Sequence, residues 1–81
     1  MRLSELLKGL SAIVGHVEDA HPGDIVARRL RELGFVAGEP VKVVATGPFG
    51  RDPLLVQVGF TRFALRRAEA ARVMLAEGSA P

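Results

Sequence analysis

Residues Arg28–Gly38, which read RRLRELGFVAG, decide the fold because a helix ends and a strand is launched within this stretch. Leu30 and Leu33 are three residues apart, so they share one side of the predicted helix. Gly34 follows at the position just past the helix, where the backbone needs a positive φ. Phe35 is then expected to fold back onto the last helical turn, against Leu30. The stretch therefore fixes how a helix meets a sheet.

Outward from this stretch, the sequence predicts one helix among short strands. Gly38 and Pro40 reverse the chain into a strand. The helix is predicted over residues 22–33, with Pro22 at its first position and Asp24 in its first turn, where a negative charge is favourable. Runs of β-branched residues and alternating polarity predict strands over residues 10–17, 40–46, 54–58, 61–65 and 72–76.

The order of these elements predicts a mostly β fold. We expect a small SH3-like antiparallel barrel of about five strands with one inserted α-helix. The last strand is expected to close the barrel and leave no bare edge. Residues 1–76 are predicted to form this single domain, and residues 77–81 a disordered tail.

Length and composition narrow the class of protein further. A chain of 81 residues is near the lower limit for one hydrophobic core. The absence of cysteine excludes disulfides and thiolate metal sites, and it suits a reducing compartment. No apolar run approaches the ~20 residues of a membrane span, and Glu5 and Lys8 interrupt the only stretch that could be a signal peptide. We expect a cytoplasmic protein.

Four segments in this order resemble the FeoA family. They are LSEL at residues 3–6, RLRELGFVAG at 29–38, GPFGRDPL at 47–54 and RFALRRAEA at 62–70. The resemblance implies an SH3-like accessory protein of bacterial ferrous iron uptake, which binds and modulates the membrane transporter FeoB from the cytoplasmic side. A related alternative is a metal-binding regulatory module akin to the C-terminal domain of DtxR-type repressors.

Two positions depart from the family pattern. Lys8 precedes Gly9 where the family often has proline before glycine, at the end of a helical turn predicted over residues 5–8 and capped by Ser4. Ala68 stands where a capping serine or aspartate is common. We therefore expect the helical turn near residues 67–71 to lack a side-chain cap, at a cost of about 1 kcal/mol.

The sequence offers no catalytic pattern. The candidate nucleophiles and bases are Ser4, Ser11, Ser79, His16 and His21, and no serine has an evident base beside it. The glycines at 47 and 50 are not followed by the Lys-Ser or Lys-Thr pair of a phosphate-binding loop. The prediction is a protein that is not an enzyme.

One cluster of possible metal ligands precedes the predicted helix. His16, Glu18, Asp19, His21 and Asp24 carry nitrogen and oxygen atoms that suit Fe²⁺ or Zn²⁺. Their spacing matches no established site, and a solvated loop with a helix-capping acid is the favoured interpretation. We expect no bound cofactor, and a surface site for Fe²⁺ or Zn²⁺ at these residues is the alternative.

The predicted partner-binding residues are Phe49, Arg28, Arg31 and Arg51. Phe49 lies in a loop rich in glycine and proline, where it either packs back onto the barrel or projects as a partner anchor. The arginines either meet an acidic partner surface or form a solvated face.

Nucleic acid is the second kind of partner that the composition suggests. The pI of about 9.9 and the arginine clusters favour it, but the net charge is only +2 and there is no tyrosine or tryptophan for base stacking. A protein partner is therefore preferred. The sequence makes no prediction about oligomeric state.

Overall fold

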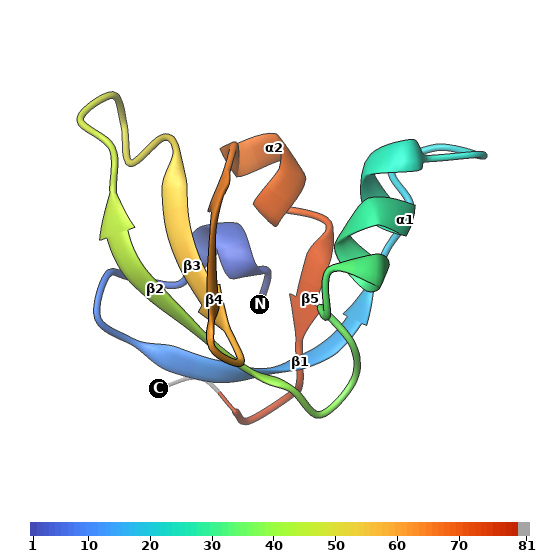
Figure 1. Cartoon of the computed structure of the whole chain (residues 1–81), viewed down its shortest axis with the longest axis horizontal. Coiled ribbons are helices and arrows are strands. Elements are labelled where there is room, and N and C mark those ends of the chain that lie inside the picture. The colour runs from blue at the N-terminus through green and yellow to red at the C-terminus, as the bar shows by residue number, and fades with distance from the viewer. Residues whose placement is uncertain (80–81) are drawn as a thin grey trace.

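The computed structural model describes residues 1–79 and contains one five-stranded sheet with two α-helices and a 3₁₀ turn (Figure 1). In chain order the elements are η1 (Leu3–Glu5), β1 (Ser11–Val17), α1 (Ile25–Glu32), β2 (Pro40–Thr46), β3 (Leu54–Val58), β4 (Thr61–Leu65), α2 (Arg67–Ala70) and β5 (Val73–Leu75). All neighbouring strands are antiparallel, in the order β4-β3-β2-β1-β5. The mostly β class with one longer helix after the first strand is confirmed.

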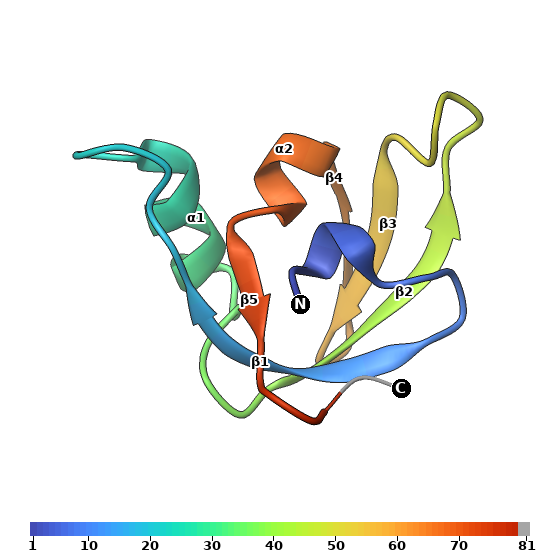
Figure 2. The ribbon, with the colours of Figure 1, turned by 180° about the vertical axis from the view of Figure 1, so that it is seen from behind.

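The sheet curls into a barrel that is only partly closed, so the predicted closure is wrong. β4 and β5 stand at the two ends of the strand order. Both ribbon views show α2 between these two strands (Figures 1 and 2). The edge of β5 is paired with the N-terminus, because the amide of Leu75 donates to Met1 O at 2.9 Å and Arg2 forms a bridge with Met74. No such pairing covers the outer edge of β4 within residues 1–79.

The core lies inside the curl of the sheet, and alternation along the strands supplies most of it. Buried apolar side chains come from every element, including Leu3, Leu6, Val14, Val41, Val43, Leu54, Val56, Leu65, Ala70 and Val73. Phe35 is fully buried beside Phe63, with ring centroids 5.9 Å apart. A tilted aromatic pair of this kind adds about 0.5–1.5 kcal/mol to the stabilisation from its buried area.

The loop after α1 follows the sequence prediction closely. Gly34 has a φ of 112°, and the amide of Phe35 donates to Leu30 O at 3.1 Å, which folds Phe35 back onto the last turn. Gly38 has a φ of 91°, and its amide donates to Val14 O at 2.9 Å. The turn is thus tied both to the helix before it and to β1.

Helix α1 differs from its prediction in its start and in its buried side. It begins at Ile25 instead of Pro22, because Asp24 is the N-cap and lies outside the helix. Leu30 is buried with Ala27, three residues earlier, whereas Leu33 is 39 % exposed at the C-cap. Three residues fall short of a full helical turn, so each step of three moves the side chain backwards around the helix axis. The step from Leu30 to Leu33 therefore takes Leu33 away from the buried side. Leu33 therefore does not anchor the helix.

The short helical turns also start earlier or are capped differently than predicted. The N-terminal turn is Leu3–Glu5, and Ser4 is buried inside it and does not cap it. At α2, the amide of Arg67 donates to Asp52 Oδ1 at 3.1 Å, and the amide of Arg66 donates to Glu69 Oε1 at 2.7 Å. Ala68 lies inside α2 and not at its capping position, which is Arg66, and the side chain of Arg66 makes no capping hydrogen bond.

Part of the predicted tail lies against β1. Ser79 Oγ accepts a hydrogen bond from the amide of Ile13 at 3.2 Å and donates one to Ala76 O at 2.7 Å. Residues 80–81 of that predicted tail lie outside the described residues. In the part of the chain that the structure describes, none of the helices has the length and apolar character needed to cross a membrane.

Candidate partner-binding surface

Phe49 projects from the tip of the loop between β2 and β3, where its side chain is 83 % exposed. Hydrogen bonds brace this loop from within and from both sides. The amide of Gly47 donates to Pro53 O at 2.7 Å, Arg51 Nη2 to Leu6 O at 2.9 Å, and Arg67 Nη1 to Gly50 O at 2.9 Å. The structure thus presents Phe49 to solvent on a loop that is held in place.

The three predicted arginines do not form one cluster with Phe49. Arg51 is half-buried with a φ of 63° and holds the loop, as described above. Arg31 Nη2 donates to Val17 O at 2.8 Å and to Asp19 Oδ1 at 2.6 Å, which joins α1 to the end of β1. Arg28 is exposed on α1, and within residues 1–79 it has no hydrogen bond or ion pair through its side chain. Two of the three arginines therefore stabilise the fold.

Phe60 is a second exposed aromatic residue, which the sequence reasoning missed. It lies in the turn between β3 and β4 and is fully exposed. Val58 pairs with Thr61, so Gly59 and Phe60 form a two-residue hairpin turn, and Gly59 has a φ of 59°. The sequence contains the signal for this exposure. A glycine and an aromatic residue separate two strands of alternating polarity, and a residue at the tip of such a hairpin cannot face the core.

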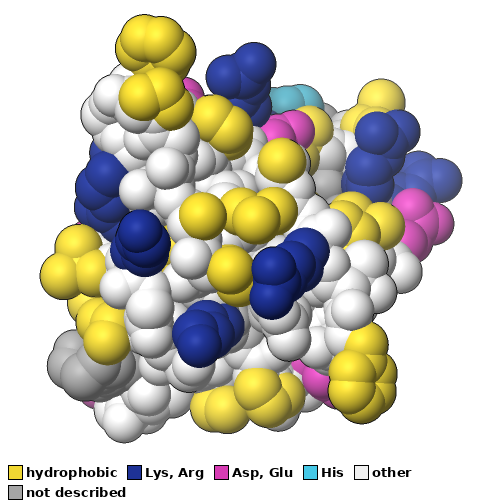
Figure 3. All heavy atoms as spheres, turned by 60° about the vertical axis from the view of Figure 1, so that its left-hand side comes forward, with side chains coloured by type: hydrophobic (Ala, Val, Ile, Leu, Met, Phe, Trp, Pro, Cys, Tyr) yellow, Lys and Arg dark blue, Asp and Glu magenta, His cyan; other side chains and the backbone are white. Residues whose placement is uncertain are grey.

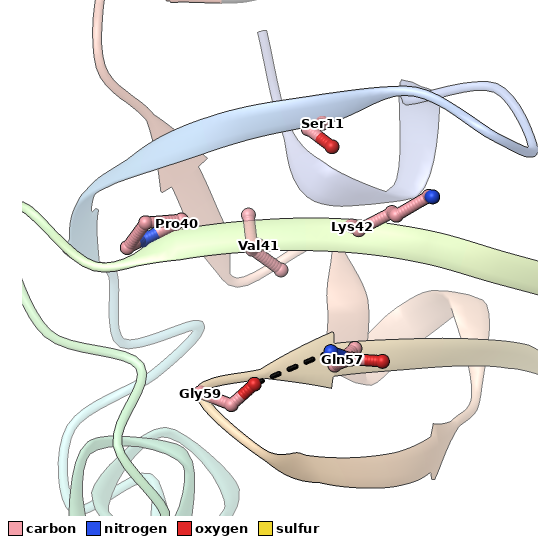
Figure 4. Close-up of a pocket in the computed structure, with 6 residues that line it drawn as sticks. All are labelled: Ser11, Pro40, Val41, Lys42, Gln57 and Gly59. Atoms are coloured by element: carbon pink, nitrogen blue, oxygen red, sulfur yellow. Dashed lines mark hydrogen bonds between the residues drawn. The ribbon is translucent and has the colours of Figure 1, made fainter.

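A polar row crosses the outer face of the sheet between the two aromatic tips. Ser11 lies opposite Lys42, Lys42 opposite Gln57, and Gln57 opposite Arg62. Gln57 Oε1 accepts from Arg62 Nε at 3.1 Å, and its Nε2 donates to Gly59 O at 3.3 Å (Figure 4). A shallow hollow of about 280 Å³ lies over this row, and no carboxylate lines it.

The face that carries the β2–β3 loop is basic and apolar overall. Figure 3 shows hydrophobic patches among Lys and Arg side chains there, with few acidic side chains. Such a surface suits a partner with acidic groups around apolar ones.

The predicted metal ligands are used mostly by the protein itself. Glu18 Oε1 accepts from Arg2 at 3.0 Å, and Asp19 accepts from Arg31 as described above. His16 is exposed on β1. Among residues 1–79, no three His, Cys, Asp or Glu side chains are grouped closely enough to hold a metal ion.

Asp24 is buried and fully hydrogen-bonded. Its Oδ1 accepts from the amides of Val26 and Ala27 at 3.0 and 3.3 Å, and its Oδ2 accepts from Arg72 Nε at 2.6 Å and from the amide of Ala20 at 2.8 Å. The hydrogen bond from Arg72, followed by those from the backbone, holds the pKa of Asp24 well below its usual range. His21 Nε2 lies 3.9 Å from the same carboxylate. Asp24 is therefore a structural cap of α1.

These features define the class of protein as a small SH3-like domain with exposed aromatic loop tips and a basic outer face. The sequence model of the FeoA domain matches residues 1–77, so the chain belongs to the FeoA family, which is linked to ferrous iron transport.

Individual relatives agree with this assignment. The FeoA of Stenotrophomonas maltophilia, solved in complex with zinc and described as an SH3 domain protein, is 60 % identical; the match covers 100 % of this chain and 95 % of that one, with a TM-score of 0.92. A fusion of Fe²⁺ transport protein A with the Fe²⁺ transporter FeoB from Porphyromonas gingivalis is 37 % identical over 73 residues, which are 90 % of this chain and 8 % of the fusion. A manganese-dependent transcriptional repressor, at 19 % identity over 93 % of this chain and 40 % of its own, shares the fold with a TM-score of 0.76.

Proposed function

We propose that this chain is a docking protein without enzymatic activity that binds the FeoB-type ferrous iron transporter on its cytoplasmic side and modulates it. The Porphyromonas gingivalis fusion is the observation that carries the proposal, because it joins a relative of this chain to a FeoB transporter in one polypeptide. A covalent link of this kind raises the effective concentration of one domain at the other. Separate chains that do the same work need a binding surface instead.

The exposed aromatic tips are the best candidates for that surface. Phe49 is exposed on a loop whose backbone is already fixed by hydrogen bonds, so the loop loses little conformational entropy when a partner binds. Phe60 stands in the turn at the other end of β3. Burial of one such ring against a partner stabilises a complex by roughly 1.5–3 kcal/mol.

The arrangement of serines and histidines supports a role without catalysis. Ser4 is buried in η1, Ser11 lies on the outer face of the sheet, and Ser79 is bonded to the backbone. Within residues 1–79, neither histidine is hydrogen-bonded to a serine, which a nucleophile and its base would require.

Binding to the purified cytoplasmic domain of the organism's FeoB-type transporter tests the proposal. We expect saturable binding that falls at least tenfold for Phe49→Ala or Phe60→Ala and is unchanged for the control Leu7→Ala, another exposed apolar residue. Cells deleted for this protein should take up less Fe²⁺. Full uptake in those cells, together with no binding to the transporter, would overturn the proposal.

A further inference from the structure

The outer edge of β4 is open to another strand. β4 ends the strand order, and none of its backbone groups takes part in a hydrogen bond outside the pairing with β3 within the described part of the chain. In a two-residue hairpin, Val58 and Thr61 form a hydrogen-bonded pair, and such pairs alternate along the ladder. The amides and carbonyls of Arg62 and Ala64 therefore point away from β3. Unpaired groups of this kind are a template for strand addition.

An apolar groove reaches β4 at its last residue, Leu65. Its lining residues are Ile25, Val26, Arg29 and Leu30 of α1, Leu33 at the C-cap of α1, Leu65 of β4 and Glu69 of α2, and its volume is about 160 Å³. In both ribbon views β3 lies on one side of β4 and α1 on the other (Figures 1 and 2). The open edge thus faces the side of the molecule where the helix stands.

The helix wall of the groove is exposed and mostly apolar. Ile25, Arg29 and Leu33 are spaced four residues apart and form one ridge along α1. Ile25 is 70 % exposed and Leu33 is 39 % exposed. An open strand edge next to an apolar helix ridge supplies main-chain hydrogen bonds and side-chain contacts together, as strand addition requires.

We infer that β4 and α1 bind an extended segment of another protein, which pairs with β4 as a sixth strand and places alternate apolar side chains in the groove. This binding mode is defined by the chemistry of the bound segment and of the groove. It therefore does not require the partner to be the transporter.

Arginines in the groove, on β4 and directly after β4 favour an acidic segment. Arg29 lines the groove, Arg62 belongs to β4, and Arg66 follows β4 directly; in the described chain none of them has a carboxylate within 4.0 Å of its side chain. The one acid of the lining, Glu69, already accepts the amide of Arg66. A second copy of this chain paired at β4 would bring the same arginines together, which like-charge repulsion disfavours.

An eight-residue peptide of alternating valine and glutamate, acetylated, amidated and labelled with fluorescein, is the probe. We expect saturable binding to the full chain by fluorescence anisotropy at low salt, and at least tenfold weaker binding of the matched peptide of alternating valine and lysine. The amides of Arg62 and Ala64 should gain protection from hydrogen exchange. Methylation of the peptide nitrogens on one edge should abolish binding, because it removes the donors that pair with β4.

Two substitutions test the contributions of the β4 edge and of the groove to peptide binding separately. Ala64→Pro removes an outward N–H at an edge position, where proline is tolerated, and is expected to weaken binding at least tenfold. Ile25→Glu should do the same through the helix ridge, whereas Val36→Glu, at another exposed apolar residue, should leave binding unchanged.

Three results would overturn the inference. Equal binding of the methylated peptide by the wild-type chain would exclude strand addition even if Ala64→Pro fails to fold. Equal binding of the lysine peptide would exclude an acidic occupant. Dimerisation of this chain with protection of the β4 amides would assign the edge to a second copy.

Discussion

Arg72 Nε donates a 2.6 Å hydrogen bond to Asp24 Oδ2 and so joins the residue before β5 to the N-cap of α1, across 48 positions of sequence. Because the same carboxylate also caps α1, one buried side chain holds both the start of the helix and its place on the barrel.

This pair should make the stability of the fold sensitive to acid. The pKa of Asp24 is lower in the folded chain than its unfolded value of about 3.9, so the ionised carboxylate stabilises the fold fully above that pH. The contribution is lost as the pH falls below it towards the folded pKa. We expect Asp24→Asn to lower the free energy of unfolding by urea at pH 7, and this deficit to shrink below about pH 4. A deficit that stays constant down to pH 2 would contradict the assigned cause, and Glu18→Gln, at an exposed ion pair, is the control.

The two leucines of α1 should differ sharply in their effect on stability. Leu30→Ala leaves a cavity in the core and is expected to cost about 2–5 kcal/mol. Leu33→Ala should cost less than about 1 kcal/mol, because that side chain is already partly exposed. Denaturant unfolding of both variants measures the difference, and equal losses would show that Leu33 does anchor the helix.

Gly47 is expected to tolerate no side chain. A Cβ there would overlap the carbonyl of Asp52 and the ring of Pro53, so Gly47→Ala should cost about 1–3 kcal/mol and shift the loop that displays Phe49. Gly50→Ala is the matched control, since its Cβ would meet open space and only the left-handed backbone, with a φ of 63°, penalises it by roughly 1–2 kcal/mol. Loop amide shifts in NMR spectra that are larger for Gly50→Ala would argue against this view.

Substitutions of Arg28 and Arg31 should affect different properties, namely partner affinity for Arg28 and the stability of the fold for Arg31. Arg31→Ala removes two hydrogen bonds from α1, one to Val17 at the end of β1 and one to Asp19 just after it, and is expected to lower the unfolding free energy by about 1 kcal/mol. Arg28→Ala should change stability by less than about 0.5 kcal/mol and act only on partner affinity. Thermal unfolding and partner titration of both variants test this, and the reverse pattern would refute it.

Much of the fold could be predicted from sequence patterns that involve neighbouring residues. Gly34 and Phe35 are neighbours whose roles follow from the end of a helix, and strand alternation follows from the two sides of a sheet. The Asp24–Arg72 pair was invisible because it depends on how α1 packs against a segment 48 residues away. For the same reason the sequence could not show that Arg31 and Arg51 are used for internal hydrogen bonds, nor that Leu33 rotates off the core.

The pairing of Met1 with Leu75 has a practical consequence for protein engineering. An affinity tag placed before Met1 would be attached to the residue that pairs with β5, and is expected to weaken that pairing. For biophysical work on this chain, an affinity tag should therefore be placed after Pro81.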